Sequence, residues 1–386
     1  MMTSKVDSGK PIVIWHEFDG PGDTSIEVLE EICELYTERY GVKVIPEVMS
    51  IHDLGRRLVD IANTGAGPHI AFVPADMLVF AEQAKYAEVP AEPFLDLVGQ
   101  DSLASMTMNG KQLGIPILTG NHLVLYSNKD IYPVPPASWE EIARTASMLL
   151  DKGITPIGAD LKQSYWFVPL LSAFGGWPMR DGKPHLDNEE MKQALAFVSD
   201  AFEQGIVASL DGSTALLDDF INGKLGAILC GEWIYTHLSR NLQDKLTVSK
   251  LPDIGGNPSI SMTSSIGFVY PNGSLDSDAR EQILSFTSFM LSEECQLKWV
   301  NRVQRIPANT RVQQDLLTKS SPNTQAILSL LPTSRPMPIH PAIITTWKAM
   351  SAGIEILQEQ GPEEAFRRME LTANSDTPLI GTEDVQ

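Results

Sequence analysis

The sequence predicts a protein of the α/β class, in which helices alternate with the strands of a largely parallel sheet. Short apolar runs at 10–15, 42–48 and 69–74 indicate strands. Between them, the segments at 24–40 and 52–63 have apolar residues that recur at helical spacing. Strands joined through helices in this way run parallel, with right-handed crossovers. The length of 386 residues favours two domains.

Turn-forming residues separate these first elements. The first strand is followed by a Gly-rich turn that starts at Asp19, and Gly41 ends the first helix. The second helix ends at the sequence Thr64-Gly-Ala-Gly-Pro. The first ~75 residues therefore read β-α-β-α-β.

The rest of the chain contains further helices and strands and no internal repeat. The residues from Gly110 to Pro116 indicate a hairpin, and Ser138 is expected to cap a helix at 139–151, with Glu141 at its third position. Gly175 and Gly176 end a helix at 165–174. Other helices are expected at 188–204, 214–222, 278–291, 323–331, 342–358 and 362–372. Other strands are expected at 123–126, 225–229 and 266–270.

Composition excludes several functions. Asp and Glu number 49 against 29 Lys and Arg, and the net charge of −20 argues against a surface that binds nucleic acid or an anionic membrane. No apolar run approaches the roughly 18 residues that a membrane helix needs. The polar residues before Pro11 have no signal-peptide core, and we expect them to be a tether that follows an export signal.

Cys33, Cys230 and Cys295 share no metal-ligand spacing and are expected to be buried free thiols.

Motifs of the common enzyme classes are missing. The sequence has no Gly-x-Gly-x-x-Gly after the first strand, no phosphate loop, no His-Glu-x-x-His and no Gly-x-Ser-x-Gly. The carboxylate pairs Glu140-Glu141 and Asp218-Asp219 are adjacent on expected helices, so their side chains diverge by about 100°. A glycosidase needs two carboxyls that face one bond. We therefore expect these pairs at the surface, and no catalytic residue, metal site or cofactor.

Polar residues follow the first and third strands. Open α/β sheets bind ligands beyond the carboxyl ends of their strands, which here are His16 to Asp19 and Pro74 to Asp76. This geometry is a reason to look for a ligand site at these two ends before any family is considered.

A series of short segments occurs in one order along the chain. They are Ile12 to Trp15, Ala62 to Ile70, Asn109 to Pro116, Leu125 to Asp130, Pro136 to Ile142, Gly175-Gly176, Phe220 to Gly226, Cys230 to Trp233, Arg335 to Pro338, and Trp347. In this order and spacing they resemble the extracellular solute-binding proteins of the maltose/maltodextrin-binding type. The resemblance runs from about Pro11 to Thr372.

This resemblance implies two α/β lobes in the two-lobe periplasmic-binding-protein fold (type II), hinged by crossing segments. The N-lobe would comprise 1–118 and 267–312, and the C-lobe 119–266 and 313–386, with the hinge near 118–121, 263–266 and 310–322. A carbohydrate would bind in the cleft and close it by hinge bending. The implied partner is the membrane permease of an ABC importer. The resemblance further implies a monomer located in the periplasm or tethered to the cell surface as a lipoprotein.

The resemblance also implies ligand-binding residues. Sugar sites use flat aromatic faces for the C–H face of the ring and planar polar groups for its hydroxyls. Trp233 and Trp347 match the stacking tryptophans of the family, and Tyr165 matches a sugar-contacting tyrosine. Asp19 and Asp76 match acids that bind hydroxyls, and the alternative for both is a helix N-cap or a turn residue.

Other positions depart from the pattern of the maltose-binding type. A tryptophan, an arginine, a lysine, two glutamates and a tyrosine of the family are replaced, in that order, by Val73, Met77, Gly20, Gly120 or Asn121, Gln163, and a residue near Ser213. These replacements favour another di- or oligosaccharide, or a modified sugar, over linear maltodextrin. Residues that could substitute locally are His16, Glu17, Asn121, His122 and Trp166. We take Glu17, Asn121 and Gln163 as further ligand-binding candidates.

Three other functions stay open. A polyamine would suit the acidic set Glu17, Asp19, Asp76 and Glu232 beside Trp233. A phosphorylated compound would need Arg side chains or free amides at a helix N-terminus, and Arg is sparse near these positions. A glycoside-processing enzyme would need the carboxylate pair that is missing. The sequence does not separate a transporter partner from a sensor.

Overall fold

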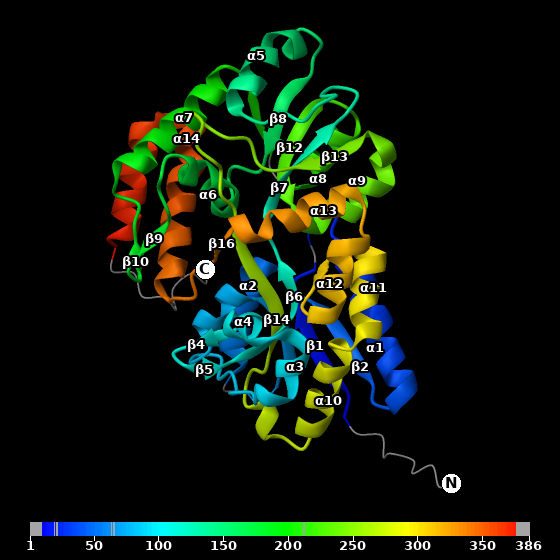
Figure 1. Ribbon diagram of the computed structural model, residues 1–386. Helices are drawn as coiled ribbons and strands as arrows, with labels where there is room; N and C mark the ends of the chain where they lie inside the picture. Colours follow the sequence, from blue (N-terminus) through cyan, green and yellow to red (C-terminus); the bar gives the residue numbers. More distant parts are fainter. Residues whose placement is uncertain are drawn as a thin grey trace. The chain divides into compact units, whose positions relative to one another are not determined.

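The computed structural model describes residues 10–18, 20, 22–62, 64, 66–210 and 213–375, without the side chains of His52 and Ser213. The chain divides into two units (Figure 1). The first unit comprises Met1–Asn121, Glu232–His237 and Thr263–Leu328. The second comprises His122–Gly231, Leu238–Met262 and Ser329–Gln386. Each unit is a sheet with helices packed on it, which confirms the predicted α/β class.

The sheet of the first unit has the strand order β15-β6-β14-β3-β1-β2. The strands in this order are β1 (Ile12–His16), β2 (Val44–Val48), β3 (Ile70–Pro74), β6 (Gly114–Gly120), β14 (Met262–Val269) and β15 (Ile306–Pro307), and β16 (Arg335–Pro336) pairs with β14 outside this order. β1 runs parallel to both β2 and β3. β14 runs antiparallel to both β3 and β6, so β6 points the same way as β3 and β1. The carboxyl ends of β1, β3 and β6 therefore lie at one edge of the sheet.

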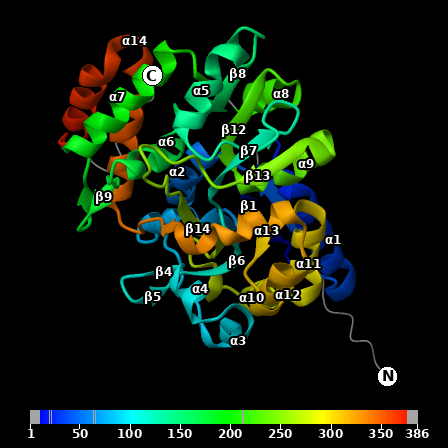
Figure 2. The same cartoon turned by 45° about the horizontal axis from the view of Figure 1, so that its top comes forward.

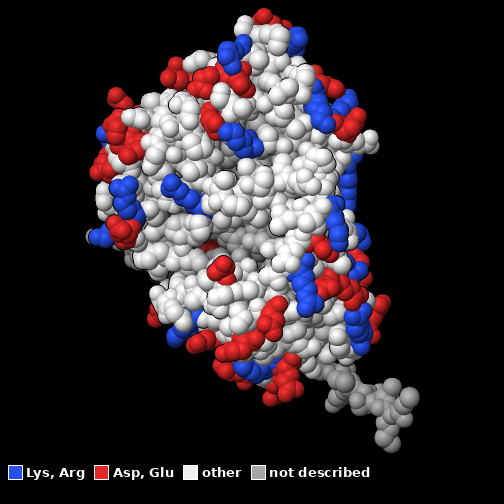
Figure 3. Space-filling view, viewed as in Figure 1, with Lys and Arg blue, Asp and Glu red and all other residues white. Residues whose placement is uncertain are grey.

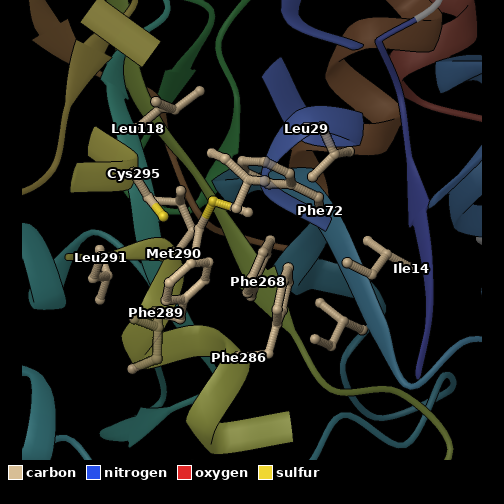
Figure 4. Close-up of a cluster of buried hydrophobic side chains, with 14 of the residues drawn as sticks. Ile14, Leu29, Phe72, Leu118, Phe268, Phe286, Phe289, Met290, Leu291 and Cys295 are labelled. Atoms are coloured by element: carbon tan, nitrogen blue, oxygen red, sulfur yellow. The ribbon is translucent and has the colours of Figure 1, made fainter. Parts of the chain in front are cut away.

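Helices cover this sheet and enclose an aromatic core. The helices are α1 (Ser25–Tyr40), α2 (Ile51–Ile61), α3 (Leu95–Val98), α4 (Gln100–Ala104), α10 (Arg280–Met290), α11 (Glu293–Val303), α12 (Thr310–Lys319) and α13 (Pro322–Ser329). Phe72 and Phe268 meet edge to face on neighbouring strands, with 4.8 Å between ring centroids. Phe286 of α10 stacks on Phe268, and Figure 4 shows these rings among buried aliphatic side chains. Rings that pack in these geometries gain free energy beyond the burial of their area.

The second unit has its own sheet, with the order β11-β8-β12-β7-β13. Its strands are β7 (Leu123–Asn128), β8 (Thr155–Ala159), β11 (Val207–Ser209), β12 (Leu225–Gly231) and β13 (Leu246–Ser249). β8 runs parallel to β11 and β12, and β7 runs antiparallel to β12 and β13. Two-stranded hairpins lie outside the sheets: β4 (Thr107–Met108) with β5 (Lys111–Gln112), and β9 (Met179–Arg180) with β10 (Lys183–Pro184).

The helices of the second unit include one with a sharp kink. They are α5 (Trp139–Leu150), α6 (Ser164–Ala173), α7 (Glu189–Glu203), α8 (Ser213–Ile221), α9 (Tyr235–Leu242), whose first three residues group with the first unit, and α14 (Ala342–Ala373). Figures 1 and 2 both show α7 and α14 side by side. α14 is broken at Gly361, where φ is 81°, and Pro362 starts the second half. The two helices predicted at 342–358 and 362–372 are thus confirmed as the two halves of α14.

Local signals in the sequence place several elements correctly. Ser138 caps α5, where its hydroxyl accepts a hydrogen bond from the backbone N–H of Glu141. The Glu141 carboxylate in turn accepts from the backbone N–H of Ala137, at 2.7 Å. The predicted hairpin turns at Asn109 and Gly110, both of which have positive φ. The apolar pattern does not predict α11 or α12, because α12 buries only Val312 and α11 buries Gln296 among its few core residues.

The chain passes between the two units at several positions. It does so after Asn121, Met262 and Leu328, and also on entering and leaving the short segment Glu232–His237. Residues 313–328, which the resemblance assigns to the C-lobe, group with the first unit, because α12 packs on α11, α3 and β15. The six residues Glu232–His237 also group with the first unit, which the sequence does not predict.

The structure bears on several expectations about the cysteines, the carboxylate pairs and the surface. The three cysteines are buried and free, as predicted. The carboxylate pairs lie on helix surfaces, where Glu140 accepts from the backbone N–H of Gly255 and Asp219 pairs with Lys224. Acidic and basic side chains are interspersed on the face shown in Figure 3. Within the described residues, no helix has the length and apolar character to cross a membrane.

Replacing Gly353 by Ala tests the packing between the two halves of α14. A Cβ atom at this position would lie 2.4 Å from the Cγ of Met369 and 2.5 Å from the backbone oxygen of Ala365. Because a backbone oxygen cannot move aside, we expect Gly353→Ala to lower the free energy of unfolding by about 1–3 kcal/mol. Urea denaturation measures this loss. Gly20→Ala is the control, since no atom lies within 4 Å of its Cβ position. Equal stability of the two variants would contradict the packing.

Candidate functional site

The edge of the first sheet at which β1, β3 and β6 end gathers three of the residues singled out from the sequence. Glu17 directly follows β1, Asp76 lies two residues beyond β3 in a 3-10 turn, and Asn121 directly follows β6. All three are half-buried. The register places these ends close together, because Pro74 pairs with Ile266 of β14 and Gly120 pairs with Ser264 of the same strand. Asp19, the fourth candidate of this region, lies outside the described residues.

Hydrogen bonds fix the end of β6. Asn121 has a φ of 46°, in the left-handed region, and its backbone N–H donates to Oε1 of Glu232 over 3.1 Å. The hydroxyl of Thr263 donates to the backbone oxygen of Gly120 over 2.7 Å. The strand therefore ends in a defined turn that directs the backbone N–H of Asn121 at a carboxylate.

That carboxylate belongs to a buried ion pair. The Nε atom of Arg305 lies 3.9 Å from Oε1 of Glu232, and both residues are 1 % exposed. Backbone contacts hold the chain at Arg305. The backbone N–H of Arg305 donates to the backbone oxygen of Trp299, and the next residue, Ile306, pairs with Thr119 of β6. Among the described residues, Oε2 of Glu232 and both Nε and Nη2 of Arg305 have no hydrogen-bond partner.

Burial raises the pKa of Glu232, and the negative charge of Asp23 adds to this effect. The positive charge of Arg305 and the N–H of Asn121 act in the opposite direction. A buried carboxylate is retained in the charged form only when such partners compensate for its lost hydration. Burial is the larger effect, so the pKa of Glu232 is raised overall, and Arg305 and the N–H of Asn121 limit that rise.

His16, the last residue of β1, is buried without charge. Its Nδ1 atom accepts a hydrogen bond from the backbone N–H of Phe18 over 3.2 Å, so the proton of the neutral ring is on Nε2. Among the described residues, Nε2 has no hydrogen-bond partner. Burial lowers the pKa of His16 from 6.5 to about 4, and the ring is neutral at pH 7.

The second unit holds three further candidates at the starts of two helices. Gln163 precedes α6, Tyr165 lies in its first turn, and Trp347 lies early in α14; all three are half-buried. The Ser164 hydroxyl donates to the backbone oxygen of Trp347 over 3.2 Å, which ties the two helices together. The Tyr165 hydroxyl donates to the backbone oxygen of Met262 over 3.3 Å. Tyr165 and Trp347 are thus held on neighbouring helix starts.

Trp166 and Trp177 extend the aromatic character of this unit. The indole N–H of Trp166 donates to the backbone oxygen of Leu229, and its ring meets Tyr165 edge to face. The guanidinium group of Arg335 lies over the ring of Trp177, 5.0 Å from its centroid. Trp177 follows the Gly175-Gly176 pair and could have been found from that motif.

Trp233 lies on the other unit. It is the middle residue of the 3-10 turn Glu232–Ile234, half-buried, and groups with the first unit although β12, which precedes it, belongs to the second. Of the sequence candidates, the first unit therefore holds Glu17, Asp76, Asn121 and Trp233, and the second holds Gln163, Tyr165 and Trp347.

Some residues that could substitute for missing family groups are not available to a ligand. Among the possible substitutes, His16 and His122 are buried, and Val73, which replaces a tryptophan of the family, lies in the core strand β3. The side chain of Ser213 lies outside the described residues. Among the described residues, no group of three or more His, Cys, Asp or Glu side chains is arranged to hold a metal ion.

Lowering the pH tests the environment of His16. Since its folded pKa is about 4, the unfolded chain binds more protons between pH 4 and 6.5. The stabilisation by neutral His16 is complete above about pH 6.5, is lost as the pH falls towards 4, and is constant below that. We expect the free energy of unfolding to fall by about 3 kcal/mol in total over this range because of His16. Urea denaturation of the wild type and His16→Gln over this range measures it, and parallel pH profiles would contradict the assignment.

A comparison with protein families is consistent with this geometry. Residues 31–326 match the family model described as bacterial extracellular solute-binding protein. The match covers well over half of the chain and includes most of both sheets. The chain therefore belongs to this family. Membership makes it a protein that binds a small solute outside the cytoplasm, in the periplasm or at the cell surface, and indicates an ABC permease as its partner.

Proposed function

We propose that this solute-binding protein captures a neutral di- or oligosaccharide and delivers it to the permease subunits of an ABC importer. The ligand-binding residues in this proposal are Glu17, Asp19, Asp76, Asn121, Gln163, Tyr165, Trp233 and Trp347. No step of this function breaks a bond of the ligand, in keeping with a family that is typically non-enzymatic.

The observation that carries the proposal is the aromatic pair of the second unit. Tyr165 and Trp347 are half-buried on the starts of two helices that a hydrogen bond from Ser164 ties together. Aromatic faces that are rigidly held and partly exposed suit the flat C–H face of a pyranose ring. A fully buried ring such as that of Trp299 offers no such face.

The polar half of the proposed site comes from the first unit. Glu17, Asp76 and Asn121 lie at one edge of its sheet, and carboxylates and amides are the planar groups that bind sugar hydroxyls. Ligands of open α/β sheets bind at such edges. We propose that ligand binding brings groups of both units onto one solute, with bending at the segments where the chain passes between units.

Charge favours a neutral solute over a polyamine or a phosphorylated compound. Glu232, one of the acids that would suit a polyamine, is paired with Arg305 and has little charge to spare for a cation. The same pairing neutralises Arg305, which is buried, so a phosphate group gains little there. Glu17 and Asp76 keep a polyamine as the second candidate.

A ligand panel tests the proposal. We expect one class of neutral di- or oligosaccharide to raise the melting temperature, because a ligand that binds only the folded state stabilises it. Removing a stacking ring by Trp347→Ala or Trp233→Ala should weaken binding at least about tenfold, which corresponds to about 1.4 kcal/mol. Differential scanning fluorimetry identifies the ligand, and titration calorimetry measures Kd.

Tyr40→Ala is the matched control. Tyr40 is an exposed aromatic residue at the end of α1, and α1 starts from the binding edge and runs to the opposite edge of the sheet. Its replacement should leave Kd unchanged. A shift in melting temperature with polyamines or phosphorylated solutes, and none with any sugar, would overturn the carbohydrate assignment and leave the family unchanged.

A further inference from the structure

The segment Glu232–His237 groups with the first unit although both of its neighbours in sequence belong to the second. Because the chain on both sides of these six residues belongs to the second unit, the six residues need contacts of their own with the first unit. Ile234, Tyr235 and Thr236 are buried, and the Tyr235 and Ser321 hydroxyls lie within 3.4 Å of each other. The contacts made by Glu232 are the charged part of this attachment.

Glu232 is bound on two sides by parts of the chain that are themselves fixed. The backbone N–H of Asn121 reaches Oε1 from the end of β6, and the guanidinium group of Arg305 faces the same oxygen from the residue before β15. Since β15 pairs with β6, both partners move as one body with the sheet. Neither charge is exposed to water, so the mutual attraction is screened far less than at a surface.

Trp233 is the next residue after Glu232, on the same 3-10 turn. The orientation of its ring relative to the first sheet therefore depends on where Glu232 is held. A ring that stacks on a ligand must be placed within a fraction of an ångström, and such placement comes from hydrogen bonds and packing behind the contacting group.

We propose that Glu232 and Arg305 are positioning residues for Trp233: the buried ion pair fastens its turn to the first unit, so that Trp233 acts together with the polar edge of that unit. The pair itself does not touch the ligand. This inference rests on the proposed function for its effect on affinity, but the placement of Trp233 does not depend on which solute binds.

A double-mutant cycle on Kd tests this role with the sugar that the panel identifies. Glu232→Gln keeps an oxygen for the N–H of Asn121 and removes the charge that faces Arg305. We expect it to raise Kd about tenfold, or about 1.4 kcal/mol, in the wild-type background. In a Trp233→Ala background it should have no further effect, because it acts through that ring. An equal effect in both backgrounds would overturn the proposal.

A second readout needs no ligand. Acrylamide quenching of each protein, minus that of its Trp233→Phe counterpart, isolates the fluorescence of Trp233. We expect Glu232→Gln to change the accessibility of Trp233 in this difference. Unchanged quenching and unchanged Kd would overturn the proposal. If no sugar binds the wild type but the quenching changes, the proposed function fails and the positioning role stands.

Two further variants separate positioning from stability. Arg39 and Glu294 form an exposed ion pair between α1 and α11 of the same unit, so Glu294→Gln is the matched control and should leave Kd and quenching unchanged. The double variant Glu232→Gln/Arg305→Met removes both buried charges, and replacement of a whole buried pair is commonly tolerated. We expect it to keep a near-native melting temperature and still weaken sugar binding. Wild-type affinity in this variant would contradict the role of the pair.

Discussion

Strand β14 determines which strand ends lie side by side in the first unit. It runs antiparallel between β3 and β6 and so aligns two strands that are far apart in the sequence, with their carboxyl ends at one edge. Glu17, Asp76 and Asn121 all follow strands that end at this edge. Without β14, β6 would have no fixed position relative to β1 and β3. The turn at Asn121 would then have no fixed position from which its N–H could donate to the carboxylate of Glu232.

The sequence predicts the local parts of this arrangement well and its long-range parts poorly. The β-α-β-α-β start is predicted because each element has its own periodicity and its own Gly-containing boundary, as at Gly41. The edge position of Glu17 and Asp76 follows from that start alone, because parallel strands share an end. The helix α12 is not predicted, because it buries only Val312 and so carries no apolar stripe.

The ion pair of Glu232 and Arg305 shows why the contacts behind Trp233 could not be predicted from one sequence. The two residues are separated by more than seventy positions, and neither belongs to a charge pattern on a common helix. The Gly231-Glu-Trp motif draws attention to Glu232, but only as one acid among several. That it is buried, and neutralised by an arginine, depends on β15 pairing with β6 at a residue next to Arg305. Pairing between strands so distant in sequence has no local signal.

The assignment of Trp233 to the first unit changes how ligand affinity would be coupled to conformation. In the resembling family, the stacking aromatics belong mainly to one lobe and the hydroxyl-binding groups mainly to the other. Here Tyr165 and Trp347 belong to the second unit and Trp233 to the first. In the proposed function, one solute contacts groups of both units, so its affinity would differ between conformations of the protein. Binding shifts a conformational equilibrium only by the difference in affinity between its states. Under the proposed function, stacking on these rings would add to the hydrogen bonds as a part of that difference.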